Sequence, residues 1–235
     1  KENLGKVKIN QNTNFLMLRY LNGNQNNFLK KLNLLLKERN VLIGNKINLV
    51  KKIINDVKKN QDKAVLKYEK KFSKLKKIST KNIIFSKSEI NKIINKLDPK
   101  IKKSIDLAYN RIAKFHKNQK IKSFNISDKN KNHLSYTFSP IEKIGVYVPG
   151  GIASYPSSVL MNCIPANIAG VKELFMTTPS INGNFNPAVI YAAKKCKVKK
   201  IYKVGGAQAI AAMAYGTKKI KKVNKIVGPG NQFVA

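Results

Sequence analysis

Three polar residues in the second half of the chain, Tyr147, Gln208 and Asn231, could take part in binding a cofactor. Each stands beside a short apolar segment and a turn rich in glycine or proline. Gln208 closes the run Gly205-Gly206-Ala207-Gln208, which opens a helical segment. A helix N-terminus suits a pyrophosphate, because its N–H groups are unpaired and carry a partial positive charge, and glycines let the backbone come close. Tyr147 could form an aromatic wall, and we expect the three side chains to converge on one concave patch.

Each of these residues also has an ordinary structural explanation. Tyr147 could be a core tyrosine whose hydroxyl is paired. The turn at Gly205 could join a strand to a helix without any ligand, and Asn231 could cap a helix. The run is not Gly-x-Gly-x-x-Gly, and no acidic residue follows at the position of a ribose partner. The residues alone therefore leave both interpretations open.

The segments around these turns alternate between strand and helix character. Apolar strand segments begin at Ile144, Leu174, Ile201 and Lys225, and helical segments lie between them at 158–169, 187–195 and 209–215. Strands that alternate with helices pair in parallel through right-handed crossovers. We therefore predict that residues 141–235 form an α/β domain, an incomplete Rossmann-like parallel sheet of at least four strands with helices on both faces. The four strand-end loops should lie together at one edge, where such sheets bind ligands.

The residues before 141 have a mainly helical pattern. We predict an N-terminal helical extension over 1–40 and the mainly helical part of a first α/β domain, incomplete here, over 41–140. Apolar residues from Ile47 to Val57 follow a helical period, which breaks near Asn60. The remaining elements expected here are a short strand at 81–85, a capping box from Ser86 to Glu89, a helix after Asp98-Pro99, and a linker or irregular hairpin at 120–140.

The remaining candidate residues for chemistry are two histidines and two cysteines. His116 falls on the helix expected after Pro99 and is best explained by packing or hydrogen bonding, and His133 lies in a polar segment exposed to solvent. Isolated histidines without clustered carboxylates do not make a metal site. Cys163 and Cys196 lie in apolar helical stretches, so we expect buried, unpaired thiols that react slowly.

Several motifs together resemble histidinol dehydrogenase, and they occur in the same order along the chain. The motifs are Tyr147–Gly151, Ser158–Val171, Val204–Ala211 and Lys225–Asn231, with weaker similarity at Val57–Tyr68 and Ile112–Gln119. The resemblance extends over nearly the whole chain, but the chain corresponds to only about half of such an enzyme. Since the chain also begins at Lys1 rather than Met, we expect it to be a fragment.

The resemblance implies a function and a set of site residues. It implies that Tyr147, Gln208 and Asn231 contact NAD, and that the enzyme oxidises L-histidinol to L-histidine through an aldehyde, the last step of histidine biosynthesis. It also implies a homodimer, a zinc ion that holds the substrate and a glutamate–histidine pair that supplies base chemistry. No residue of this chain matches the catalytic pair or the zinc ligands. We expect those residues beyond Ala235, and we expect no activity from the isolated chain.

One position departs from the family pattern. Where the family usually has a glycine before an aspartate, this chain has Gln61 before Asp62. The resemblance therefore does not predict the backbone geometry at Gln61.

The net charge of +36, from 47 basic and 11 acidic residues, supports an alternative function. A non-catalytic basic protein could bind nucleic acid or other polyanions. However, the lysines are scattered, arginines are few, and the richness in Lys, Asn and Ile is typical of A/T-rich codons. We therefore expect only weak, salt-dependent polyanion binding. A non-enzymatic interaction domain is disfavoured because small residues gather at the strand ends.

The chain contains neither an 18-residue apolar run nor a signal peptide, so we expect a cytoplasmic protein.

Overall fold

The computed structural model describes residues 21–73, 77–150, 155–180, 183–230 and 234, and it divides into two units, 1–44 and 45–235. The first unit contains the beginning of helix α1 (Phe28–Phe72). Several of its apolar side chains are exposed, among them Leu29, Leu34 and Leu36. A dimer contact by this extension remains a prediction.

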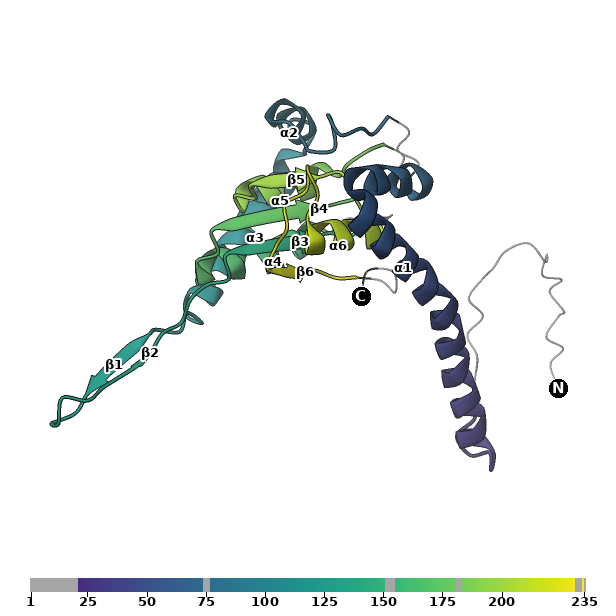
Figure 1. The fold of residues 1–235 in the computed structure, drawn as a ribbon, viewed down its shortest axis with the longest axis horizontal. Helices are drawn as coiled ribbons and strands as arrows, with labels where there is room; N and C mark the ends of the chain where they lie inside the picture. Colours follow the sequence, from purple (N-terminus) through teal and green to yellow (C-terminus); the bar gives the residue numbers. More distant parts are fainter. Residues whose placement is uncertain (1–20, 74–76, 151–154, 181–182, 231–233, 235) are drawn as a thin grey trace. The chain divides into compact units, whose positions relative to one another are not determined.

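The second unit contains a four-stranded parallel sheet in the order β5-β4-β3-β6 (Figure 1). The strands are β3 (Lys143–Tyr147), β4 (Glu173–Thr177), β5 (Lys200–Tyr202) and β6 (Lys225–Val227). Parallel pairing joins β3 to both β4 and β6, and β4 to β5. The parallel α/β fold predicted for residues 141–235 is thus confirmed.

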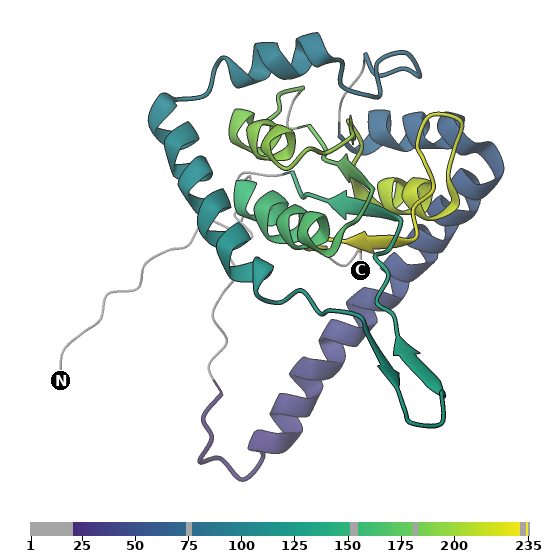
Figure 2. The same ribbon diagram turned by 90° about the vertical axis from the view of Figure 1, so that its left-hand side faces the viewer.

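Helices cover both faces of this sheet. In addition to the later part of α1, the second unit contains α2 (Lys87–Ile94), α3 (Pro99–Lys117), α4 (Pro156–Ala169), α5 (Pro187–Lys195) and α6 (Gly206–Tyr215). Figure 2 shows α4 and α5 on one side of the strands and α6 on the other. The helices begin up to three residues earlier than the pattern predicted, since Pro156 occupies the first turn of α4 and α6 begins at Gly206.

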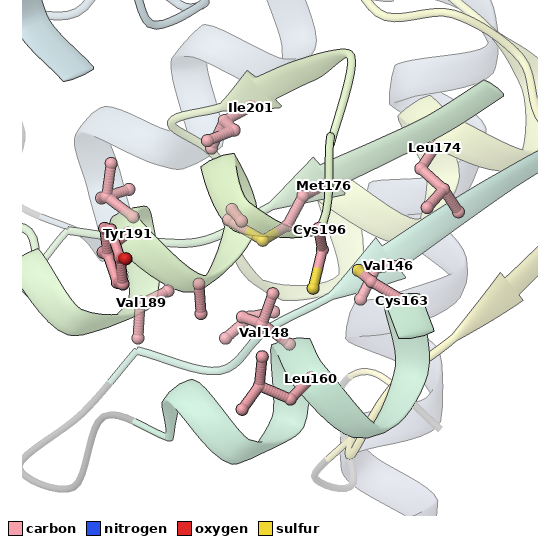
Figure 3. Packing of buried hydrophobic residues seen from close by; sticks show 14 of the residues in the cluster. Val146, Val148, Leu160, Cys163, Leu174, Met176, Val189, Tyr191, Cys196 and Ile201 are labelled. Carbon is pink, nitrogen blue, oxygen red and sulfur yellow. The ribbon is translucent and has the colours of Figure 1, made fainter. Parts of the chain in front are cut away.

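Side chains alternate along the strands between two apolar clusters, as expected for a sheet buried on both faces. Val146 and Met176 lie in the cluster on the α4–α5 side, which Figure 3 shows from close by. Tyr147 and Phe175 lie in the other cluster, together with residues of α6 and of the part of α1 that follows Val50. The two clusters pack against opposite faces of the sheet, and both include residues of the strands themselves. The strand ends are therefore fixed by packing on both faces.

Helix α1 has a sharp kink at Gln61, whose φ of 47° and ψ of −128° are not helical. The break predicted near Asn60 is therefore confirmed, one residue later. After the kink, the Asp62 carboxylate accepts a hydrogen bond from Thr217 Oγ1 in the loop that follows α6. The kink thus directs the last part of α1 onto the sheet.

The short strand predicted at 81–85 is present only as an isolated antiparallel bridge between Ile84 and Tyr202. Two backbone hydrogen bonds flank it, from Phe85 N to Ile201 O and from Lys203 N to Ile83 O. The segment therefore lies along the β5 edge but is too irregular to form a strand. The predicted capping box is confirmed, since the Ser86 hydroxyl accepts from Glu89 N and the Glu89 carboxylate accepts from Ser86 N.

Residues 120–140 contain a β-hairpin of β1 (Phe124–Ser127) and β2 (His133–Tyr136). Of the two possibilities for this segment, the hairpin is correct. Every residue of both strands is exposed. Within the described parts of the chain, none of the helices combines the length and the apolar character needed to cross a bilayer.

Candidate cofactor site

The order of the strands marks one place on the sheet as the expected ligand site. From β3 the chain adds β4 and then β5 on one side, and it returns to place β6 on the other side of β3. In open α/β sheets, ligands bind outside the carboxyl ends of the strands where the order reverses in this way. The carboxyl ends of β3 and β6 are therefore the candidate site.

The four strand-end loops lie together at this edge, and glycines allow the close contact. A Cβ atom on Gly150 would lie 2.7 Å from Cγ of Pro179, and one on Gly205 would lie 2.5 Å from its Cβ. A Cβ on Gly228, whose φ is +135°, would collide with the carbonyl oxygen of Tyr147. The loops after β3, β4 and β5 thus contact one another, and the loop after β6 contacts the end of β3, so the strand ends gather at one edge as the sequence predicted.

Tyr147, at the end of β3, is buried with 5% of its surface exposed. Its hydroxyl oxygen accepts a hydrogen bond from Gly206 N at 3.2 Å. Burial raises the pKa of the Tyr147 hydroxyl, the hydrogen bond from Gly206 lowers it, and the charge of Glu69 raises it further. The backbone of Tyr147 lies against Gly228, which follows β6, and the Tyr147 hydroxyl reaches the α6 turn.

Gln208, in the first turn of α6, is also buried, with 2% of its surface exposed. Its Nε2 donates to Glu69 Oε2 at 3.1 Å, and Gly205 N donates to the same oxygen at 3.1 Å. The N–H groups of Gly205, at the N-cap, and of Gly206, the first residue of α6, are thus bonded to Glu69 and Tyr147. Sequence reasoning that left these N–H groups unpaired did not foresee a buried acid behind the turn.

The structure brings Tyr147 and Gln208 to the same turn, but it does not expose them. The expectation that these two side chains would line an open concave patch is wrong, because each is enclosed and bonded to protein groups. Asn231, the third predicted contact, lies outside the described residues. Among the described residues of this edge, Gly150 and Gly228–Gly230 are exposed and Gly206 is half-buried, so these glycines offer backbone surface to a cofactor.

Three buried polar atoms near these turns have no hydrogen-bond partner within the described residues. They are Thr177 Oγ1, Ser180 Oγ and Glu69 Oε1. Thr177 ends β4 and stands opposite Tyr147 in the sheet, and Ser180 lies in the loop that follows. Buried polar atoms are nearly always paired with protein, water or ligand. Thr177 and Ser180 thus each carry a buried hydroxyl at the β4 end of this edge whose partner is not among the described residues.

The described residues do not supply a ligand set for zinc. Among them, no group of three or more His, Cys, Asp or Glu side chains is close enough to hold a metal ion. His116 Nδ1 is paired with Gln119 Oε1, and the exposed His133 has its Nδ1 2.8 Å from Ser127 Oγ. Both histidines have the structural environments that the sequence predicted.

The two cysteines are free and fully buried, as predicted. Cys163 of α4 and Cys196 at the end of α5 direct their sulfur atoms into the space between the helices and the sheet (Figure 3). The neighbouring Cys196 thiol and burial both raise the pKa of Cys163. Since the thiolate is the reactive form, Cys163 is a structural residue, and Cys196 is equally enclosed beside it.

Glu69 is the residue of this site that the sequence analysis missed. It lies in α1, far in sequence from the motifs at Tyr147 and Gly205, yet it is completely buried against them. One signal could have found it. Glu69 stands four residues after the buried Val65 and next to the buried Tyr68, so it falls on the apolar face of the helix.

Residues 37–235 match the family model described as histidinol dehydrogenase. The chain is 56% identical over 221 residues to the histidinol dehydrogenase of Pelagibacter ubique, which covers 93% of this chain and 50% of that protein. It is 43% identical over 174 residues to that of Rhodospirillum rubrum, covering 74% and 40%. The crystal structure of histidinol dehydrogenase from Elizabethkingia anophelis matches with a TM-score of 0.75 at 41% identity, covering 80% of this chain and 43% of the other. The chain spans about half the length, or somewhat less, of these proteins. By these matches, the chain belongs to the histidinol dehydrogenase family.

Proposed function

We propose that this chain is the NAD-contacting part of a histidinol dehydrogenase, an enzyme that oxidises L-histidinol to L-histidine. Membership of the family and the printed names of the relatives support the reaction. The observation that carries the assignment to this part of the enzyme is the edge at the strand-order reversal, where four glycine- or proline-containing loops meet.

The reaction removes four electrons from the substrate in two steps. The alcohol loses a hydride and a proton to give the aldehyde, water adds to the aldehyde, and the hydrate loses a second hydride to give the carboxylate. The balance is L-histidinol, water and two NAD⁺ giving L-histidine, two NADH and three protons. NAD, when bound, supplies the hydride acceptor, so this part of the protein has to hold the cofactor in place and exclude water from it.

The residues of this edge suit such a role through their backbone. NAD binding is proposed against the turns at Gly205–Gly206 and Gly228–Gly230. Tyr147 and Gln208 support the first turn from behind, because both are buried and hydrogen-bonded there. Asn231 follows the second turn and is the proposed side-chain contact.

The other components of the enzyme are proposed from the resemblance. The zinc ligands and the glutamate–histidine pair would come from the part of the enzyme that this chain does not span. Homodimerisation and a cytoplasmic location are proposed on the same basis.

A chimeric enzyme tests this function. Residues 1–235 would be joined to the remaining C-terminal part of the Pelagibacter ubique relative, which is 56% identical over the matched region. The chimera should form NADH in the presence of L-histidinol and lose that activity to a strong chelator, whereas the 235-residue chain alone should form none. A folded chimera without histidinol-dependent NADH formation, or activity in the chain alone, would contradict the proposal.

A further inference from the structure

Glu69 occupies an unusual place for an acidic side chain. It has none of its surface exposed, and it follows Val65 and Tyr68, which belong to the apolar cluster between α1, α6 and the sheet. A buried carboxyl without a partner is costly, so such groups are normally held by hydrogen bonds. In this chain the bonds come from the turn that opens α6.

One carboxylate oxygen of Glu69 holds two parts of that turn. Glu69 Oε2 accepts from Gly205 N, at the N-cap of α6, and from Gln208 Nε2, in the first turn. Since a carboxylate only accepts, it fixes the Gln208 amide with its NH₂ group toward Glu69. The amide oxygen of Gln208 is then directed toward Gly206, where a Cβ atom would lie 2.9 Å from it. Gly206 has a φ of +63°, a conformation in which any residue with a Cβ atom would be strained.

The groups that face Glu69 come from the turn that opens α6 and from β3. Burial raises the pKa of Glu69, while hydrogen bonds from Gly205 N and Gln208 Nε2 lower it. From β3, Tyr147 lies close enough for the charge of Glu69 to raise its pKa, and its hydroxyl bonds the adjacent Gly206 N. Glu69 and Tyr147 therefore hold two successive backbone N–H groups of one turn.

We propose that Glu69 is a positioning residue for NAD binding. Glu69 fixes the backbone of the Gly205–Gln208 turn and the orientation of the Gln208 amide. The inference rests on the proposed function for the cofactor, but the positioning itself can be observed without NAD. Glu69 is enclosed, so its effect on the cofactor passes through the turn.

Three variants of the 235-residue chain separate positioning from a general loss of stability. Glu69→Gln keeps an oxygen that can accept from Gly205 N, and Glu69→Ala removes it. Glu142→Gln removes one negative charge from an exposed carboxylate, 60% of whose side chain is accessible, and is the matched control. Glu69→Asp, with a shorter side chain, replaces the alanine variant if that variant does not fold.

Amide NMR in the absence of NAD measures the turn directly. The Gly205 N–H should lose its hydrogen-bonded shift and exchange faster in Glu69→Ala, and it should stay protected in Glu69→Gln and in the control. Gly206 should move less than Gly205, because Tyr147 still holds its N–H group.

Titration with NAD then measures how the loss of Glu69 changes the affinity for the cofactor. Glu69→Ala should bind NAD about tenfold more weakly per folded molecule, the scale expected for losing a hydrogen bond to a charged group. Glu69→Gln should stay within about twofold of the original chain. If the original chain binds no NAD, the proposed function loses its support, while the Gly205 amide still decides whether Glu69 positions the turn.

Two results would overturn the inference. One is a folded Glu69→Ala protein in which Gly205 keeps its shift and its protection. The other is a Glu69→Ala protein that is less stable but binds NAD as tightly as the original chain. Glu69 would then be a structural residue only.

Discussion

Replacement of Gln61 by glycine should stabilise this protein. Gln61 has a φ of 47° and a ψ of −128°, a combination that glycine adopts readily and that a side chain with a Cβ atom adopts at a cost. The Gln61 side chain is exposed, so its removal loses little packing. The kink is needed for α1 to bring Asp62 to Thr217, so the strain is retained in the folded state.

The size of the gain follows from two opposing terms. A non-glycine residue in such a conformation costs about 1–3 kcal/mol. Introducing glycine lowers the free energy of unfolding by roughly 0.5–1 kcal/mol, because it makes the unfolded chain more flexible. The midpoints of these two ranges leave a net gain of about 1 kcal/mol in the free energy of unfolding. For a domain of this size, that corresponds to a rise in Tm of roughly 2–4 °C.

Thermal and urea unfolding of Gln61→Gly and Gln61→Ala would test this argument. Alanine keeps the Cβ atom that causes the strain, so Gln61→Ala should show no comparable gain. The reasoning would be refuted if glycine destabilised the protein, or if alanine stabilised it equally.

Three further predictions concern other parts of the chain. Cys163 and Cys196 should react slowly with a thiol reagent in the folded protein and rapidly in denaturant, since both are fully buried; fast labelling of both in the folded state would contradict this. The hydrogen bond from Lys67 lowers the pKa of Asp56 to about 2, so its contribution to stability is present above the ordinary pKa of 3.8 and lost as the pH falls toward 2. Lys67→Met should raise that pKa, measured by carboxyl NMR, and an unchanged titration would exclude Lys67 as the main cause. DNA binding should be weak, independent of sequence and steeply salt-dependent, and tight sequence-specific binding at physiological salt would show that the charge of +36 serves nucleic acid.

The parallel sheet and its loops could be predicted because the signals are local. Each strand from Ile144 to Val227 is short and apolar and ends in a turn of small residues, and helical segments separate the strands. The break in the helical spacing of apolar residues near Asn60 and the capping box at Ser86 could likewise be recognised from the order of residues alone. Such features depend on neighbours within about one turn of chain.

The parts that could not be predicted depend on contacts between distant segments. Glu69 and Gln208 are separated by 139 positions, so no local pattern reveals that the acid occupies the helix N-terminus and that Gln208 is enclosed. The segment near Ile84 has strand composition, but it makes only one bridge to the edge of the sheet. Burial and edge pairing are properties of the assembled fold, and they decided these cases.

The central claim is that NAD binds at the strand ends on either side of β3. Amide NMR during titration of the 235-residue chain with NAD tests it most directly. The account predicts saturable shifts of the Gly205, Gly206, Gly228 and Gly230 amides, with little change in the β1–β2 hairpin. Absence of saturable binding, or shifts confined to residues away from this edge, would contradict the account.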